Sequence, residues 1–311
     1  MRNTTDFRSS STSDDDGFAG WETVVTRTAL EKTLADVLGT TPERIVELEG
    51  GQIGSVFRVS LANGRTVVAK TGNTPLATEA FMLEYLAEES YLPVPSVVHA
   101  SDELLLMEYI DGSTTHDEGV ARDAARQLAS LHEIEGPAYG FPRDTLTGPV
   151  RQPNPWTESW LEFYRTHRLH HAGAIAANPE SGPGTLPEYL FERLEKCIGD
   201  LESILEEPPQ SSLIHGDVWR TNVLSRDGRV TGFLDPATYY ADPEIELAYI
   251  DWTDTFGPTF FDAYERERSI RDGFWERRRF VYRVYPLLVH VHLFGGSYVD
   301  ELEATLERLG Y

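Results

Sequence analysis

Three polar residues and one histidine in a short stretch have the types and spacing of a phosphoryl-transfer centre. His215 and Asp217 follow a short apolar run, Asn222 comes five residues after Asp217, and Asp235 ends the next apolar run. Transfer of a γ-phosphoryl group needs a base for the acceptor hydroxyl and hard oxygen ligands for Mg²⁺. The pattern H-x-D-x-x-x-x-N followed by a strand-terminal Asp supplies both. Single acids in loops are usually only solvated, but this combination of spacings rarely arises by chance.

The residue types predict one role each. Mg²⁺ prefers carboxylate and amide oxygens, so we expect Asn222 and Asp235 to hold the metal. Asp217 is then free to accept the proton of the substrate hydroxyl. We expect His215 to brace the loop by hydrogen bonding rather than to act as a catalyst.

Composition limits the class of protein. The chain has 311 residues, of which 40% are hydrophobic, and this is enough for one large domain or two lobes. No apolar run approaches membrane-spanning length and the N-terminus lacks a signal-peptide core, so we expect no membrane association. Cys197 is the only cysteine, which precludes an intramolecular disulfide and fits a reducing cytoplasm.

The charge balance is strongly acidic. The 27 basic and 51 acidic residues give a net charge of −24, which excludes nucleic acid as an expected partner because phosphate binding needs a basic face. The lysines are Lys32, Lys70 and Lys196, and arginine supplies the other basic residues. Acid excess with few lysines indicates a protein adapted to a salty cytoplasm, where salt screens self-repulsion. The alternative is an acidic protein from ordinary salt.

A glycine-rich turn and a strand lysine in the first third of the chain could bind nucleotide phosphates. The turn offers backbone amides that could approach phosphates closely at Gly50, Gly51, Gly54 and Ser55. Lys70 ends a strand-like run, where a lysine could pair with the α- and β-phosphates. In a lysine-poor chain, a retained strand lysine suggests a need for a compact ammonium. An ordinary turn and a surface lysine are the alternatives.

Two further segments complete the expected nucleotide site. Glu79, near the start of a helix predicted over 78–88, is the candidate partner for Lys70, and Glu84 is the competing candidate. The apolar strand 104–110 would be the hinge between two lobes, where the backbone of Glu108, Tyr109 and Ile110 would bind adenine. An ordinary buried strand explains most of the same run.

The remaining pattern predicts a sheet-rich first part and a mainly helical second part. We expect a disordered tail over 1–20, a nucleotide-binding sheet lobe over 21–111, and a lobe over 112–311 with the catalytic loop and substrate site. The segment 139–156 is predicted to be an irregular loop, and its role is open. Expected strands are 44–49, 55–61, 65–71, 96–100 and 104–110, and expected helices are 26–38, 119–133, 158–171, 187–205, 243–252, 256–266, 272–294 and 298–309.

With these elements in this order, the chain resembles the fructosamine kinase family, within the aminoglycoside and choline phosphotransferase-like kinases. HGDVW at 215–219 is similar to the family's HGDLW, and DPATYYADPEIELA at 235–248 is similar to its DPA-x-YG-D-x-E-x-DLA segment. Gln152, Asn154 and Trp156, followed by Trp160, resemble its Q-x-N-x-W…W element. The resemblance covers about residues 43–295.

The resemblance implies an α+β, two-lobed protein-kinase-like fold and the use of ATP with Mg²⁺. It also implies phosphorylation of a ketosamine, the rearranged adduct of a sugar and an amine, at the sugar 3-hydroxyl. The phosphorylated adduct then decomposes and frees the amine, which is deglycation repair. Trp219 could stack on the sugar or on a cationic amine, or could simply pack in the core. With Asp217 and Gln152, Trp219 forms the expected substrate site.

Two other functions remain open from the sequence. The nearer is a kinase of another small alcohol, such as an aminoglycoside, choline or homoserine; the further is a pseudokinase that only binds nucleotide. The sugar, the choice between a free and a protein-bound amine, the state as monomer or homodimer, and the role of Arg220 are also open.

Overall fold

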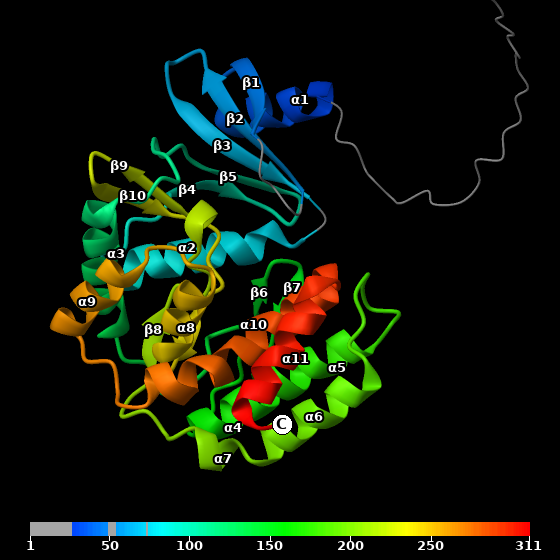
Figure 1. Ribbon diagram of the computed structural model, residues 1–311. Coiled ribbons are helices and arrows are strands. Elements are labelled where there is room, and N and C mark those ends of the chain that lie inside the picture. Colours follow the sequence, from blue (N-terminus) through cyan, green and yellow to red (C-terminus); the bar gives the residue numbers. More distant parts are fainter. Residues whose placement is uncertain (1–26, 49–53, 73) are drawn as a thin grey trace, which may run out of the picture.

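The computed structural model describes residues 27–48, 54–72 and 74–311 and shows a small sheet lobe beside a larger helical lobe (Figure 1). This arrangement confirms the predicted antiparallel sheet lobe followed by a mainly helical lobe. The predicted tail over 1–20 and the glycines Gly50 and Gly51 lie outside the described residues. The boundary after residue 111 stays a prediction.

The first lobe is built on a five-stranded antiparallel sheet. Its strand order is β1-β2-β3-β5-β4, so β5 lies next to β3 and β4 forms the edge of the sheet. Gly64, in the turn between the second and third strands, has a φ of +82°, which glycine adopts at little cost. The strands are β1 Pro42–Leu48, β2 Ser55–Leu61, β3 Thr66–Thr71, β4 Val97–Ala100 and β5 Leu104–Glu108.

The two faces of this sheet are covered by different helices. Leu104 and Leu106 of β5 pack in one cluster with α1 (Arg27–Leu38), whereas Leu105 and Met107 pack in another with α2 (Leu76–Glu89). Side chains alternate along a strand, so β5 is buried on both faces. The same alternation in β3 directs the side chain of Lys70 toward α2.

The second lobe is mainly helical and holds the largest hydrophobic cluster. Among the described residues, no helix combines the length and apolar character that crossing a membrane requires. The helices are α3 Glu118–His132, α4 Trp160–Tyr164, α5 His171–Ala177, α6 Glu188–Gly199, α7 Leu201–Ile204, α8 Glu244–Trp252, α9 Pro258–Glu267, α10 Arg279–Phe294 and α11 Ser297–Leu309, with π-helical segments η1 Arg165–His170 and η3 Phe274–Arg278.

Short strands in this lobe hold the catalytic segment. One antiparallel pair turns at Asp227-Gly228, and both turn residues have positive φ, as the tight turn requires. The other short strands form two further antiparallel pairs. These elements are β6 Thr145–Thr147, β7 Val150–Gln152, β8 Ser212–Ile214, η2 Arg220–Asn222, β9 Val223–Arg226, β10 Arg229–Phe233 and β11 Tyr239–Ala241.

Two local predictions were wrong. The segment 139–156 contains the β6–β7 hairpin, whose three-residue strands are too short to give a periodic signal. The helix predicted over 187–205 is divided at Asp200, whose backbone has left the helical region. Asp competes for backbone hydrogen bonds in this way and therefore favours helix ends.

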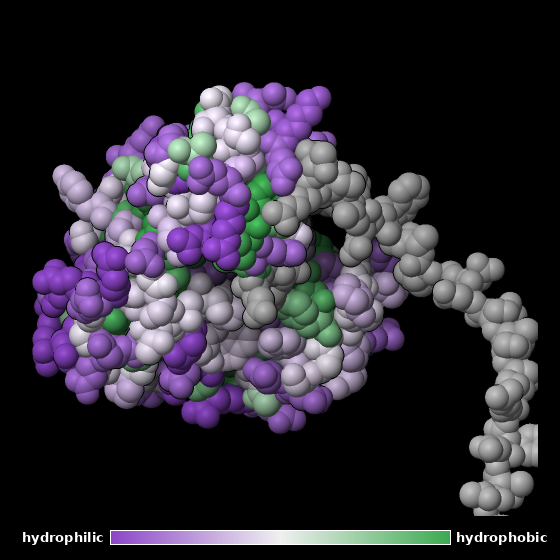
Figure 2. All heavy atoms as spheres, turned by 90° about the horizontal axis from the view of Figure 1, so that it is seen from above, coloured by the Kyte–Doolittle hydropathy of each residue, from purple (hydrophilic) through white to green (hydrophobic). Residues whose placement is uncertain are grey.

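The surface is largely polar on the face that Figure 2 shows. Figure 2 shows one face of the molecule on which hydrophilic residues predominate and apolar residues form only scattered patches. Such a surface is expected for a chain with a net charge of −24.

Candidate active site

The cleft between the lobes brings Lys70 together with carboxylates from both lobes. Its Nζ lies 2.7 Å from Oε1 of Glu79 on α2 and also pairs with the carboxylate of Asp235. The competing candidate, Glu84, is exposed on α2. Burial alone would lower the pKa of Lys70, but the charges of Asp235 and Glu79 outweigh burial and raise it above its usual value. The ammonium is therefore charged at neutral pH.

Asp217 lies in the loop after β8 and is held by two neighbours. Nδ2 of Asn222 donates to Oδ2 of Asp217 at 2.9 Å and to its backbone oxygen at 3.0 Å. Burial raises the pKa of Asp217 to about 7, against the hydrogen bonds from Tyr249 and Asn222 and with a further increase from the charge of Asp235. A carboxylate with a pKa near the working pH is suited to general base catalysis.

Asp235 occupies an unusual backbone position at the end of β10. Its φ is +53°, a region that residues other than glycine seldom adopt, and its side chain is 46% exposed. The neighbouring Leu234 amide donates to the carbonyl oxygen of Asn222 at 2.8 Å. This bond ties the two candidate metal-binding loops together and turns the Asp235 carboxylate toward the cleft.

The catalytic loop depends on Gly216. Its φ is +89°, and a Cβ at this position would lie 2.2 Å from the carbonyl oxygen of Ala237. His215 is fully buried beside it, and its Nδ1 accepts the amide of Asp217 at 3.3 Å. His215 therefore braces the loop by a hydrogen bond, the role expected from the sequence.

The buried carboxylate of Glu246 holds the same loop through backbone hydrogen bonds. Glu246 on α8 accepts the amide of Gly216 at 2.5 Å and lies 2.9 Å from Nε2 of His132 on α3. Burial would raise the pKa of Glu246, but the hydrogen bond and charge of His132 prevail and hold it below its usual value. In the sequence, Glu246 stands where the family motif has Asp, and this acidic position in the motif was the available signal for its role.

The inter-lobe cleft gathers part of the predicted nucleotide site, but Gly54 is not among its lining residues. The predicted hinge residues Glu108, Tyr109 and Ile110 are not among the residues that line it. The amide of Glu108 already donates to the Ser96 carbonyl oxygen at 2.9 Å, and Tyr109 packs under Arg58. An adenine contact at the hinge would therefore use other backbone groups. The predicted residues that line the cleft are Ser55, Lys70, Glu79, Asp217, Trp219, Asn222 and Asp235.

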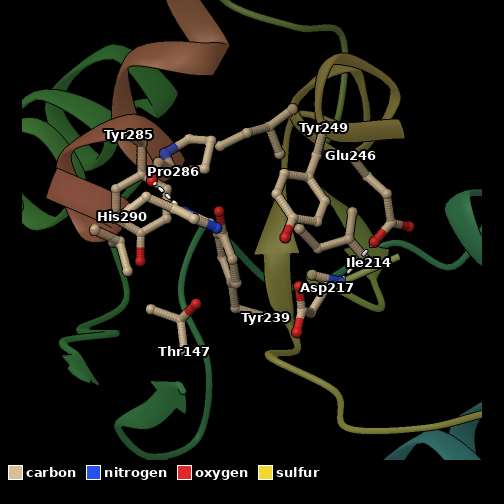
Figure 3. Close-up of a pocket in the computed structure, with 12 residues that line it drawn as sticks. Thr147, Ile214, Asp217, Tyr239, Glu246, Tyr249, Tyr285, Pro286 and His290 are labelled. Atoms are coloured by element: carbon tan, nitrogen blue, oxygen red, sulfur yellow. Dashed lines mark hydrogen bonds between the residues drawn. The ribbon is translucent and has the colours of Figure 1, made fainter. Parts of the chain in front are cut away.

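A second, smaller pocket lies between α8 and α10, and Asp217 lines both cavities. Figure 3 shows the Tyr249 hydroxyl directed toward the Asp217 carboxylate, with Tyr285, Pro286 and His290 on the opposite wall. No local pattern in the sequence signalled Tyr249 or Tyr285. The lining consists of Thr147, Ile214, Gly216, Asp217, Tyr239, Ile245, Glu246, Tyr249, Tyr285, Pro286, Val289 and His290.

The two other predicted substrate residues lie outside this pocket. Gln152 is buried, its Oε1 accepts the Tyr285 hydroxyl at 2.8 Å, and its Nε2 donates to the Ala237 carbonyl oxygen at 3.3 Å. Gln152 therefore supports the pocket wall from behind. Trp219 is partly buried and faces the inter-lobe cleft.

The residues at the cleft fit a magnesium nucleotide. Because Nδ2 of Asn222 donates to Asp217, the other atom of its amide, the oxygen Oδ1, is left for a cation. Within residues 27–48, 54–72 and 74–311, no cluster of three or more His, Cys, Asp or Glu could hold a metal without other ligands. Mg²⁺ commonly takes one or two protein oxygens and completes its shell with phosphates and water.

Comparison with known proteins agrees with this geometry. Residues 26–310 match the fructosamine kinase family model. A Synechocystis protein named "Probable ketoamine kinase" is 31% identical over 236 residues, which is 74% of this chain and 77% of that one. A Thermobifida fusca protein assigned to the fructosamine-3-kinases is 26% identical, with a TM-score of 0.80 over 91% of this chain and 99% of its own.

The fold is also that of a more distant enzyme. An aminoglycoside phosphotransferase, solved with ADP and hygromycin B, superposes with a TM-score of 0.62 over 91% of this chain and 97% of its own, at 18% identity. The predicted protein-kinase-like fold is thereby confirmed. The chain belongs to the fructosamine kinase family and is an ATP-dependent phosphotransferase that acts on a small molecule.

Proposed function

We propose that the chain phosphorylates the sugar 3-hydroxyl of ketosamines and acts in deglycation repair. The observation that carries this proposal is the position of Asp217, which lines both the inter-lobe cleft and the pocket between α8 and α10. A base in this position can face the γ-phosphate of ATP from one side and an acceptor hydroxyl from the other. Positioning of this kind is the main task of a kinase active site.

Each residue has a defined part in the reaction. Asp217 accepts the proton of the acceptor hydroxyl as its oxygen forms the bond to phosphorus, and the bond from phosphorus to the leaving oxygen of ADP breaks. Lys70, oriented by Glu79, neutralises phosphate charge. Asn222 and Asp235 would hold Mg²⁺, which neutralises charge on the β- and γ-phosphates.

The chemistry of the smaller pocket supports a neutral or cationic acceptor. Among the described residues that line it there is no Lys or Arg, and Asp217 and Glu246 contribute carboxyl groups. Arg168 lies behind the Tyr239 ring, 3.9 Å from its centre, and so is separated from the pocket by that ring. Tyrosine rings favour both the apolar face of a sugar and a nearby ammonium. A ketosamine combines these two groups.

The state as monomer or homodimer and the choice between free and protein-bound ketosamines stay open. We further propose that the protein works in a salt-rich cytoplasm. The support is the net charge of −24 and the content of three lysines. Self-repulsion at this charge destabilises the folded state unless salt screens it. Melting temperature and activity should therefore rise between dilute buffer and molar KCl.

The test is ATP consumption in molar KCl with a panel of acceptors. The panel contains a fructosamine, a ribulosamine, an aminoglycoside, choline and homoserine. We expect turnover with the ketosamines and little with the other three. A higher kcat/KM for any of those three than for the ketosamines would replace the proposed substrate class. If no acceptor is turned over and Mg-ATP does not raise the melting temperature, the assignment of a nucleotide site is refuted.

A further inference from the structure

A cluster of aromatic side chains continues outward from the smaller pocket. Trp252 of α8, His290 and Phe294 of α10, and Tyr298 of α11 form this cluster, here called the aromatic rim. The ring centres of Trp252 and His290 are 5.1 Å apart, those of His290 and Tyr298 4.8 Å, and those of Phe294 and Tyr298 5.8 Å. These separations are typical of direct aromatic contact.

The aromatic rim is continuous with the pocket that contains Asp217. His290 lines the pocket itself, and Trp252 contacts the pocket residue Tyr249 with ring centres 5.9 Å apart. From the pocket, ring contacts thus lead outward from Tyr249 to Trp252 and from His290 to Phe294 near the end of α10.

The outer end of the aromatic rim reaches solvent. The side chain of Phe294 is 47% exposed, whereas Trp252, His290 and Tyr298 are partly buried. Phe294 contacts the pocket residue His290, with ring centres 5.6 Å apart, and so gives the aromatic cluster an end that a ligand can reach. The simpler explanation is packing of α8 against α10 and α11, but this does not require Phe294 to be exposed.

The charges around the aromatic rim define what it would accept. Glu301 accepts the indole Nε1–H of Trp252 at 2.9 Å, which places a carboxylate beside the rim. His290 Nδ1 lies 2.8 Å from the Pro286 carbonyl oxygen, and burial lowers the pKa of His290, so its ring presents a neutral aromatic face. An apolar or cationic group is therefore favoured here, and a carboxylate is repelled.

We propose that the aromatic rim binds the substituent on the amine of the acceptor, and that the enzyme prefers ketosamines whose amine carries an alkyl or aryl group without a carboxylate. This inference rests on the proposed function, because the sugar hydroxyl must lie at Asp217 for the amine end to extend toward α10 and α11. The rim then sets the Michaelis constant for the acceptor and leaves ATP binding unaffected.

The experiment compares fructosamines made from methylamine, benzylamine and 6-aminohexanoate. We expect the KM of the benzylamine adduct to be about tenfold lower than that of the methylamine adduct, which corresponds to one good aromatic contact. The 6-aminohexanoate adduct should have the highest KM. Trp252→Ala should remove the preference for benzyl by raising that KM about tenfold, and should leave the KM of the methyl adduct within about twofold.

Two further variants guard against a folding defect. Phe294→Ala, at the exposed end of the aromatic rim, should reduce the benzyl preference by about threefold with an unchanged melting temperature. Tyr91→Ala removes a fully exposed ring remote from the pocket and should change neither KM. The KM for ATP should stay the same in all three variants.

The outcomes separate this inference from the proposed function. Equal KM values for the methyl and benzyl adducts, or an unchanged preference in both Trp252→Ala and Phe294→Ala, would show that the aromatic rim only packs helices. Preference for the carboxylate adduct would also overturn the inference. If no ketosamine is phosphorylated but another alcohol is, the proposed function fails first and the inference fails with it.

Discussion

The two cavities that meet at Asp217 differ in composition and origin. The inter-lobe cleft contains Lys70, Glu79 and Asp235, so charged groups from both lobes converge there. The pocket between α8 and α10 is walled mainly by aromatic and aliphatic side chains of the helical lobe. One side of Asp217 suits a multiply charged ligand with a cation, and the other suits a compact organic molecule.

This difference separates the chemistry of transfer from the choice of acceptor. Charged groups at the cleft can neutralise phosphates in any kinase of this fold. The smaller pocket offers shape, aromatic faces and few free polar groups, which are the features that select a substrate. Variants on the two sides should therefore change different kinetic constants, and a variant of Asp217 should affect the reaction as a whole.

The largest effect is expected for Asp217→Asn, which removes the proposed base from the residue that lines both cavities. The kcat should fall about 10³-fold, within the range for loss of a general base. Binding of Mg-ATP and of a ketosamine, measured by calorimetry, should change by no more than about twofold. Because burial disfavours the Asp217 carboxylate, the melting temperature should not fall. Loss of both binding reactions would point to a structural role instead.

On the cleft side, Lys70→Met should lower kcat/KM for ATP about a hundredfold while the ketosamine still binds. The variant leaves Glu79 and Asp235 without the ammonium between them, so Lys70→Met combined with Glu79→Gln serves as a control for repulsion. An equal loss of ketosamine binding in both variants would show that the two cavities are not independent.

Beneath both cavities, Glu246→Gln should destabilise the fold by about 3 kcal/mol, because it removes the charge from a fully buried pair. The pKa of Glu246 is held below its ordinary value of 4.5, so its contribution is fully present above that value and is lost as pH falls through the folded-state pKa. Denaturant unfolding should show that the free energy of unfolding falls less between pH 7 and pH 3 in the variant than in the parent. Parallel pH curves would contradict this role.

On the acceptor side, the smallest effect is expected for Tyr249→Phe. It removes one hydrogen bond to Asp217 and keeps the ring, so kcat/KM for the ketosamine should fall about tenfold. The KM for ATP should remain unchanged. A larger change in the KM for ATP than in kcat/KM for the ketosamine would show that Tyr249 affects the nucleotide cleft rather than the acceptor pocket.

The sequence was most informative where the chemistry is local. Asp217 and Asp235 follow short strands, and Asn222 comes five residues after Asp217. The strand-to-helix order brings Lys70 close to Glu79. The smaller pocket was not predictable in the same way. Its walls come largely from β8, β11, α8 and α10. Helical periodicity places Tyr249 and Tyr285 in predicted helices, but it does not show which side chains they face.

Buried polar residues were also assigned incompletely from the sequence. Asp242 and Glu244 lie at the start of a predicted helix, and the sequence indicates no partner for either. Both carboxylates are buried and paired with Arg271, and Glu244 also binds Arg278. The partners are more than twenty residues away in sequence, and local electrostatic rules cannot indicate them.

The most direct test of the central claim is the position of the phosphate on the product. ³¹P and ¹³C NMR of the product formed from ATP and a fructosamine should show a phosphomonoester on carbon 3 of the sugar, followed by release of the free amine. A stable ester on another carbon, or transfer of the phosphoryl group to water alone, would contradict the claim that Asp217 directs the 3-hydroxyl from the smaller pocket toward the nucleotide.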